Sequence, residues 1–187
     1  LTILPGVGKK SAQRMALYLL DKNKDGAGIL AKTMQEALEH IRRCSRCRML
    51  TSTELCKTCT DTSRDSSSVC VVESPSDVLA IESTGGFRGK YFVLLGRLSP
   101  IEGVGPEDLG IDDFLSLLSI EDIQEVILAT SPDFDGEATA SFIANLLKDK
   151  NISITRIARG IPVGADISYA DAASMAMAIT SRRDMGV

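Results

Sequence analysis

The sequence lacks the features that mark membrane-spanning, secreted and P-loop proteins. Its 187 residues contain no apolar run near the roughly 18 residues that a membrane-spanning helix requires. No charged segment followed by an apolar one opens the chain, and no Gly-rich loop followed by Lys and Ser or Thr occurs, so a P-loop nucleotide site has no support. We therefore expect a soluble, cytoplasmic protein with no membrane partner. Because the chain begins at Leu1 rather than Met, we also expect that a short N-terminal piece is missing.

An overall excess of positive charge is also absent. The formal net charge is -4, which argues against a uniformly basic nucleic-acid-binding protein. The charge is nevertheless divided: residues 1–60 carry eleven Lys and Arg against five Asp and Glu, a net +6, and the remainder carries ten against twenty, a net -10. A basic N-terminal part suits a polyanion, whereas the acidic remainder suits a metal ion, a basic protein surface or plain solvation.

Four of the five cysteines form two Cys-x-x-Cys pairs, "CSRC" and "CKTC", eight residues apart. The thiolates of both pairs can reach one ion, which predicts a tetrahedral zinc site with the ligands Cys44, Cys47, Cys56 and Cys59. A disulfide framework is the competing interpretation, but a reducing compartment favours metal. Four cysteines leave no open coordination position, and residues 44–62 hold few apolar side chains, so we expect the zinc to be structural.

Two further residues of metal-binding types have simpler interpretations. His40 precedes Cys44 by one helical turn and is either a spare ligand or, as we expect, a surface residue of the preceding helix. Cys70 lies in the apolar run "VCVVE", where we expect a small buried side chain.

The N-terminal stretch "LTILPGVGKKSAQRMALYLL" resembles a helix-hairpin-helix, a motif whose Pro-Gly-x-Gly loop offers backbone amides to a DNA phosphate. Gly6 and Gly8 let the backbone approach an anion, and the following helix N-terminus adds its positive end. Lys9, Lys10 and Arg14 add side-chain charge, which predicts salt-sensitive binding without sequence preference. A tight turn leading into a solvated helix start is the alternative. Such motifs usually work in pairs, so a second subunit is a natural source of avidity.

From residue 69 onward, segments of strand and helix character alternate, which predicts an α/β fold with a parallel sheet. "VCVVES", "KYFVLLG", "EVILATS" and "ISITRIARG" have strand character, and "SPSDVLAIESTG" and "DGEATASFIANLLKDKN" have helix character. Functional crevices of such sheets lie at the carboxyl ends of the strands. Glu73 ends the first strand, and Asp133, Asp135 and Glu137 follow the third.

These carboxylates resemble those of the Toprim fold of topoisomerases and primases, in which a Glu and an Asp-x-Asp hold magnesium for phosphoryl chemistry. Oxygen ligands of this kind suit a hard divalent cation. Ser131 stands where the first Asp of the pair belongs, which argues against metal-dependent catalysis. The alternative is that Glu73 and Asp133 are solvated residues at strand ends and that Asp135 and Glu137 cap the next helix.

The order of hairpin, four-cysteine site and Toprim-like sheet resembles the bacterial RecR family of recombination mediators over nearly the whole chain. The phrases that carry the resemblance are "LPGVGKKSAQRMA", "VCVVESPSDVLAIESTG", "LSPIEGVGPEDLGI", "EVILAT", "GEATA" and "TRIARGIPVGADISYAD". The sequence departs from the family at Arg97, where a histidine is usual, and at Ser131, where an asparagine is usual. The resemblance implies a helix-hairpin-helix DNA-binding region (1–43), a four-cysteine zinc finger (44–62), a Toprim domain (68–163) and a C-terminal oligomerisation arm (164–187).

What the resemblance implies about function is an adaptor rather than an enzyme. The family acts with RecO and RecF in the repair of gapped DNA and helps RecA to load on single-stranded DNA. It implies zinc at the four cysteines, contact with single- and double-stranded DNA through Lys9, Lys10 and Arg14, and dimers or ring tetramers. The acidic face with Glu73, Asp133 and Asp135 would then meet RecO, with magnesium there as a doubtful second use.

Two rival functions stay open on the residues alone. One is a metal-dependent nuclease or primase-like enzyme that uses Glu73, Asp133 and Asp135. The other is a zinc-stabilised protein-interaction module with no role on DNA.

Overall fold

A computed structural model describes residues 1–184 and divides the chain into two compact units, Leu1–Arg42 and the part from Arg43 onward. The helices and strands run in the order α1 (Lys9–Asp21), α2 (Lys24–His40), β1 (Arg42–Arg43), β2 (Leu50–Thr51), α3 (Lys57–Thr60), β3 (Ser68–Val72), α4 (Pro75–Ser83), β4 (Lys90–Val93), α5 (Ile111–Ile120), β5 (Glu125–Ala129), α6 (Phe134–Leu147), β6 (Ser153–Arg156), the 3-10 helix η1 (Ile167–Tyr169) and α7 (Ala172–Thr180).

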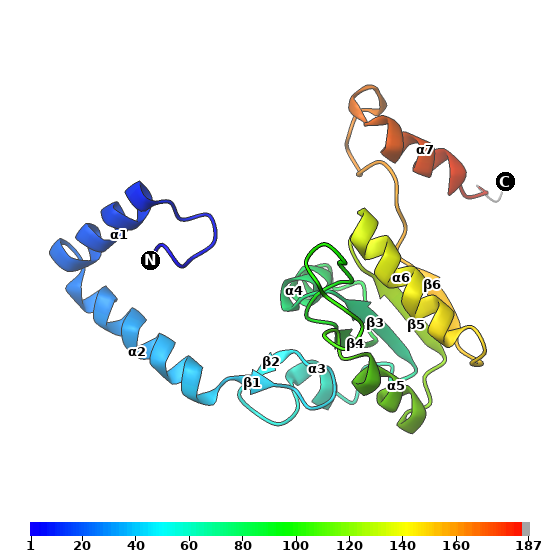
Figure 1. Cartoon of the computed structure of the whole chain (residues 1–187), viewed down its shortest axis with the longest axis horizontal. Helices are drawn as coiled ribbons and strands as arrows, with labels where there is room; N and C mark the ends of the chain where they lie inside the picture. Colours follow the sequence, from blue (N-terminus) through cyan, green and yellow to red (C-terminus); the bar gives the residue numbers. More distant parts are fainter. Residues whose placement is uncertain (185–187) are drawn as a thin grey trace. The chain divides into compact units, whose positions relative to one another are not determined.

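The first unit is a loop followed by the two helices α1 and α2 (Figure 1). The N–H groups of Lys22 and Asn23 both donate to the Tyr18 carbonyl oxygen, at 2.9 and 3.1 Å, which ends α1 and turns the chain into α2. The Asn23 side chain then caps α2 by accepting from the Gly26 N–H at 3.0 Å. Ala12 is the one buried residue of the two helices, so the pair has little core of its own.

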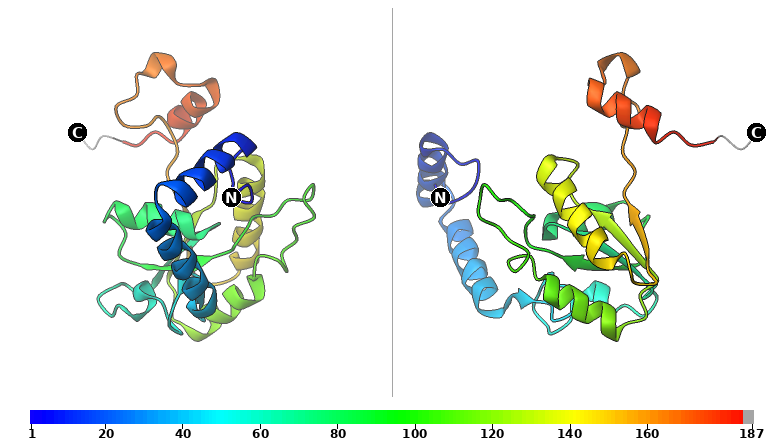
Figure 2. Two further views of the ribbon diagram at one scale, coloured as in Figure 1. Left: turned by 90° about the vertical axis from the view of Figure 1, so that its left-hand side faces the viewer. Right: turned by 45° about the vertical axis from the view of Figure 1, so that its right-hand side comes forward.

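The second unit is built on a parallel sheet in the order β4-β3-β5-β6 (Figures 1 and 2). The central strand β3 is buried along its whole length, as expected for a β-branched, apolar strand covered on both faces. From the centre of the sheet the chain moves outward in one direction through α4 to β4 and in the other through α6 to β6. Because parallel crossovers are right-handed, α4 and α6 then cover opposite faces.

Alternate residues of the strands face two separate cores. The first lies under α5 and α6 and contains Val69, Val71, Phe92, Leu94, Val126, Leu128, Phe114, Leu118, Ala140, Ile143 and Leu147. The second lies under α4 and contains Cys70, Val72, Val78, Tyr91, Val93 and Ala129, with half-buried Met49 packed against it. Met49 belongs to the cysteine-rich segment, so that segment contributes to the core of the sheet.

The predicted fold class is confirmed: the chain has a helical N-terminal region, a four-cysteine cluster and a parallel α/β sheet. Cys70 is buried as expected, and burial raises the pKa of its thiol to about 12. The helix expected near the C-terminus is α7, whose cap Asp171 accepts from the Ser174 N–H at 2.9 Å. The predicted arm 164–187 ends in residues 185–187, which lie outside the described residues. Within residues 1–184, no helix is both long and apolar enough to cross a membrane.

Candidate functional site

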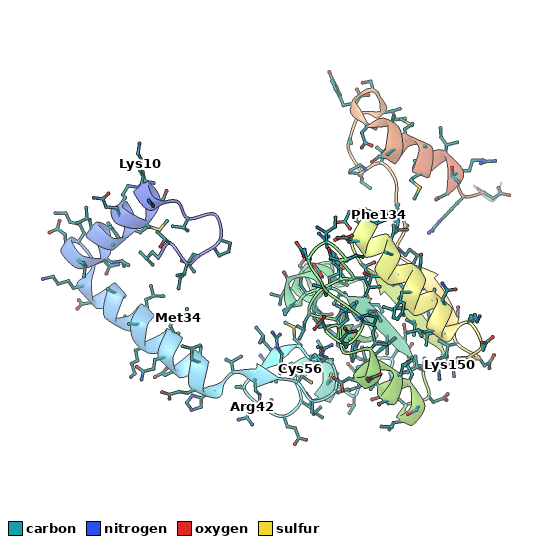
Figure 3. The ribbon with its side chains drawn as sticks, viewed as in Figure 1. Lys10, Met34, Arg42, Cys56, Phe134 and Lys150 are labelled. Carbon is teal, nitrogen blue, oxygen red and sulfur yellow. The ribbon has the colours of Figure 1, made fainter. Side chains whose placement is uncertain are left out.

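The four predicted ligands come together in one cluster. Cys44 and Cys47 lie on the turn between β1 and β2, Cys56 directly precedes α3, and Cys59 lies within it; Figure 3 labels Cys56. Their sulfur atoms all lie within 4.8 Å of one another, and Cys59 is the one of the four that is only half-buried. Across residues 1–184, this is the one group of three or more His, Cys, Asp or Glu whose ligand atoms gather closely enough to share an ion.

Hydrogen bonds within the cluster favour one thiolate at the expense of another. The Cys56 N–H donates to Cys44 Sγ at 3.3 Å, and Cys47 Sγ lies 3.4 Å from Cys56 Sγ. Hydrogen bonds from Cys47 and Cys59 lower the pKa of the Cys56 thiol, and hydrogen bonding to Cys56 raises the pKa of the Cys47 thiol. The sulfur atoms are therefore too close for all to ionise alone, and a shared cation is what would let them do so.

The spacing of the sulfur atoms fits a tetrahedral ion. Zinc–sulfur bonds of about 2.3 Å place neighbouring sulfur atoms of a tetrahedron about 3.8 Å apart, within the observed range. Four thiolates close the coordination shell, so such an ion could cross-link the segment but offers no position for a substrate. His40 is exposed, and its Nδ1 lies 2.9 Å from the Glu36 carbonyl oxygen, as expected of a surface residue.

The cysteine-rich segment is attached to the edge strand β4 by main-chain and side-chain hydrogen bonds. The Val93 N–H donates to the Cys47 carbonyl oxygen at 2.9 Å. Lys90, the first residue of β4, is only 6% exposed, and its Nζ donates to three carbonyl oxygens around α3. These belong to Thr58 at 2.9 Å, Cys59 at 3.1 Å and Asp61 at 2.7 Å. A metal in the cluster would therefore stiffen one edge of the sheet.

The carboxyl ends of β3 and β5 form the predicted crevice, and Glu73 and Ser131 meet there. The Ser131 N–H donates to Glu73 Oε1 at 2.7 Å, and the Ser131 hydroxyl donates to Glu73 Oε2 at 3.2 Å. Gly136 of α6 packs directly against this pair. A Cβ atom there would lie 2.2 Å from the Ser131 carbonyl oxygen and 2.9 Å from Glu73 Oε1, which explains the glycine. Ser131, at the position of the missing Asp, thus holds Glu73 by hydrogen bonds.

Arg97 lies against the other two predicted carboxylates. Asp133 caps α6 by accepting from the Gly136 N–H at 2.9 Å, and it forms an ion pair with Arg97. Arg97 Nε also lies 3.9 Å from Asp135 Oδ2. The Gly136 hydrogen bond and then the charge of Arg97 lower the pKa of Asp133. Glu73, Asp133 and Asp135 thus bind protein donors instead of converging on one point.

A hollow of about 690 Å³ opens beside these residues. Glu73 and Arg97 line it together with two carboxylates of the loop between β4 and α5, Glu102 and Asp108. The next carboxylate, Glu137, turns the other way and pairs with Arg156, at 2.6 Å, and with Arg159. The face is acidic but is crossed by arginines.

The N-terminal loop has the geometry expected of a backbone anion site. Gly6 has a φ of +77°, a conformation that favours glycine, and Gly8 is the N-cap of the 13-residue helix α1. Lys9, Lys10 and Arg14 are all exposed, and Figure 3 shows Lys10 at the end of α1 that adjoins the loop. The loop and these cations therefore share one end of the helix.

Comparison with known proteins decides the family. Residues 1–38 match the model of the RecR helix-hairpin-helix, residues 67–158 that of the Toprim domain, and residues 160–183 that of the RecR C-terminal region. The recombination protein RecR of Saccharophagus degradans is 48% identical over 182 residues, which cover 97% of this chain and 92% of the relative. That of Hahella chejuensis is 49% identical over 183 residues, with coverages of 98% and 91%. The chain belongs to the RecR family.

Membership confirms the family expected from the motifs and supports a role in DNA recombination and repair, as the names of these RecR proteins state. The match to the C-terminal region of RecR contains η1 and α7. The match to the hairpin of RecR contains the Pro-Gly-x-Gly loop and all three predicted DNA-binding residues.

Sequence reasoning missed the side chains that fasten the RecR cluster and crevice in place. Arg46 and Lys90 contact the cysteine segment, and Arg97 pairs with the acidic crevice. Arg46 stands between the cysteines of "CSRC", and this position was the available signal. A lysine opening an otherwise apolar strand, as Lys90 opens "KYFVLLG", was a second one.

Proposed function

We propose that the chain is a DNA-binding, non-enzymatic recombination mediator. In this proposal it works with RecO and RecF on gapped DNA and helps RecA to load on single-stranded DNA. The single observation that carries the proposal is the exposed group of Lys9, Lys10 and Arg14 beside the Gly6 turn at the start of α1. Backbone amides and exposed cations at a helix N-terminus are a recurring way to bind phosphate. Since its ligand would be chromosomal DNA, we expect the protein to act in the cytoplasm, at the nucleoid.

Zinc is the proposed cofactor, held by Cys44, Cys47, Cys56 and Cys59. The close gathering of their sulfur atoms supports this assignment. When bound, zinc supplies a structural cross-link and no chemistry of its own, because a four-thiolate shell is closed. The chain itself contributes the main-chain bond between Cys47 and Val93, which links the cluster to the sheet.

The acidic crevice is proposed as a surface for RecO rather than as a catalytic centre. Glu73 accepts two hydrogen bonds from Ser131, and Arg97 pairs with Asp133. A magnesium ion would have to displace these donors, so we treat magnesium as a doubtful second use of Glu73, Asp133 and Asp135. The remaining exposed carboxylates, Glu102 among them, would meet a basic partner surface.

Self-association is the third part of the proposal, as a dimer or a ring tetramer. Large apolar side chains of α1 and α2 are exposed: Leu17, Leu20, Ile29, Leu30, Met34 and Leu38. Exposed apolar residues in this number are typical of a surface that another chain covers. The apolar residues of α7 would contribute in the same way, with Ile179 59% exposed.

A charge-reversal experiment tests the DNA contact. In fluorescence anisotropy with a gapped duplex, Lys9→Glu with Arg14→Glu should weaken binding and reduce the salt dependence of log Kd by about two phosphate contacts. Lys22→Glu with Lys32→Glu makes the same charge change on exposed side chains of the same unit and serves as the control. Equal loss in both double variants, or no loss in either, would contradict a site at the start of α1.

The enzymatic rival has its own test. The protein is incubated with labelled gapped DNA and magnesium or manganese, and the products are separated on a denaturing gel. The mediator proposal predicts unchanged DNA with the parent chain and with Glu73→Ala. Cleavage or synthesis that Glu73→Ala abolishes would establish the enzyme instead.

A further inference from the structure

Arg46, between the cysteines of "CSRC", connects the thiol cluster to a helix of the sheet unit. Its Nη1 lies 3.8 Å from Cys59 Sγ and 3.5 Å from the Tyr91 carbonyl oxygen. Its Nε and Nη2 donate to the two carboxylate oxygens of Glu121, at 2.7 and 2.5 Å. The side chain is only 12% exposed, so it lies inside the molecule.

The geometry uses both edges of the guanidinium. A bidentate pair with Glu121, at the C-cap of α5, fixes the plane of the group, and the five N–H donors of arginine leave Nη1 free for other acceptors. Because the Glu121 carboxylate neutralises Arg46 overall, the effect on the cluster is one of position and hydrogen bonding rather than of net charge. A lysine could not hold two acceptors in this fixed way.

Cys59 is the ligand for which such a contact matters most. The other three sulfur atoms have hydrogen-bonding partners inside the cysteine segment: Cys44 has the Cys56 N–H, Cys56 has the Thr58 hydroxyl at 3.1 Å, and Cys47 has the Met49 main chain. Cys59 is the least buried of the four, and Arg46 supplies a donor to it that is anchored outside the loop of the cluster. A ligand that is open to solvent is the natural first point of metal loss and of attack by thiol reagents.

We infer that Arg46 is a positioning residue of the metal centre: held by Glu121, it fixes Cys59 and thereby controls how slowly the centre releases its ion. The inference rests on the proposed zinc site. It also separates the arginines around the cysteines by role. Arg46 and Arg48, which donates to the Leu109 carbonyl oxygen, are turned into the fold, whereas Arg42 and Arg43 are exposed. Substitution of an outer-shell partner typically costs 10–100-fold in metal affinity.

The test compares Arg46→Met with Arg43→Met, which removes the same charge from an exposed side chain of the same segment. Zinc-loaded proteins are mixed with a metallochromic chelator, and the rate of zinc transfer is followed. Arg46→Met should release zinc roughly 10–100-fold faster than the parent chain, and Arg43→Met at the parent rate. Alkylation mapped by mass spectrometry should find Cys59 modified first in Arg46→Met. Equal release from the two variants, at a temperature where both remain folded, overturns the inference.

Glu121→Gln keeps the experiment decisive if Arg46→Met does not fold. This variant retains the arginine but loses the ionic clamp, and it should release zinc faster than the parent chain; release at the parent rate overturns the inference. Cobalt titration of the parent chain separates the two assumptions. A parent chain without the absorption bands of tetrahedral cobalt thiolate refutes the zinc site itself, whereas a parent that binds cobalt and variants that release zinc equally refute only the role of Arg46.

Discussion

Cys47 and Val93 share a main-chain hydrogen bond of 2.9 Å, so the turn that carries two of the thiols continues the end of strand β4. Half-buried Met49 packs against the core under α4, on the same side of the junction. The cysteine segment and the sheet accordingly fall into one compact unit, which begins at Arg43. What happens at the cluster should therefore be felt in the sheet.

Removal of metal is the first prediction. Stripping zinc with a chelator should lower the unfolding temperature of the sheet unit, because binding free energy at a structural site contributes directly to folding. Hydrogen exchange should show the loss locally, with faster exchange of the Val93 amide. Restoring zinc should reverse both effects. An unfolding temperature that does not change on removal of the metal would count against a structural zinc.

Lys90→Met should lower the free energy of unfolding by about 1–3 kcal/mol, because it leaves three carbonyl oxygens near α3 without their buried donor. Urea denaturation measures the change. Lys148→Met, at an exposed lysine of the same unit, is the matched control and should have little effect. Similar stabilities for the two variants would show that the Lys90 contacts contribute nothing net.

Glycine substitutions should separate a crowded site from an open one. Gly136→Ala puts a Cβ 2.2 Å from the Ser131 carbonyl oxygen and should cost roughly 1–3 kcal/mol of stability. Gly28→Ala, inside α2 with nothing within 4 Å, should stabilise its helix by about 1 kcal/mol. Thermal unfolding followed by circular dichroism provides both values. A neutral Gly136→Ala would mean that the Ser131–Glu73 contact is looser than described.

The Glu82 network predicts a pH dependence. Burial opposes ionisation of Glu82, but hydrogen bonds from Arg64 and from the Tyr91 hydroxyl, the latter at 2.7 Å, hold its pKa below the ordinary value. A carboxyl group with a lowered pKa contributes stability that is fully present above its unfolded pKa of about 4.3 and is lost as the pH falls through the folded value. The parent chain should therefore exceed Glu82→Gln in stability at pH 7, and the gap should close below about pH 4.3. Urea unfolding at several pH values measures it, and a constant gap from pH 7 to pH 3 would refute the network.

The fold could be predicted from the sequence because its strands are unusually explicit. "SVCVV" is apolar and β-branched throughout, and such a run favours a strand buried on both faces whatever surrounds it. The cysteine spacing likewise restricted the cluster to one arrangement, and the four thiols were brought together as expected. Both signals are local, and local patterns survive folding.

The contacts that hold the sites in place could not be predicted in the same way. Arg46 meets Glu121 across 75 residues of chain, and Ser131 meets Glu73 across 58. A single sequence carries no pattern for such pairs, since exposed arginines and glutamates have the same letters as buried ones. The pairing of Arg97 with Asp133 depends in turn on β4 and β5 ending at the same edge of the sheet, which only the strand order decides.

Sedimentation velocity tests the mediator account most directly. The full-length protein is run alone and with gapped DNA and RecO, at low and at moderate salt. The account predicts a dimer or tetramer that sediments with the DNA at low salt and is released as salt rises, because phosphate contacts weaken steeply with ionic strength. A monomer that leaves the DNA boundary unshifted at low salt, with and without RecO, would contradict it.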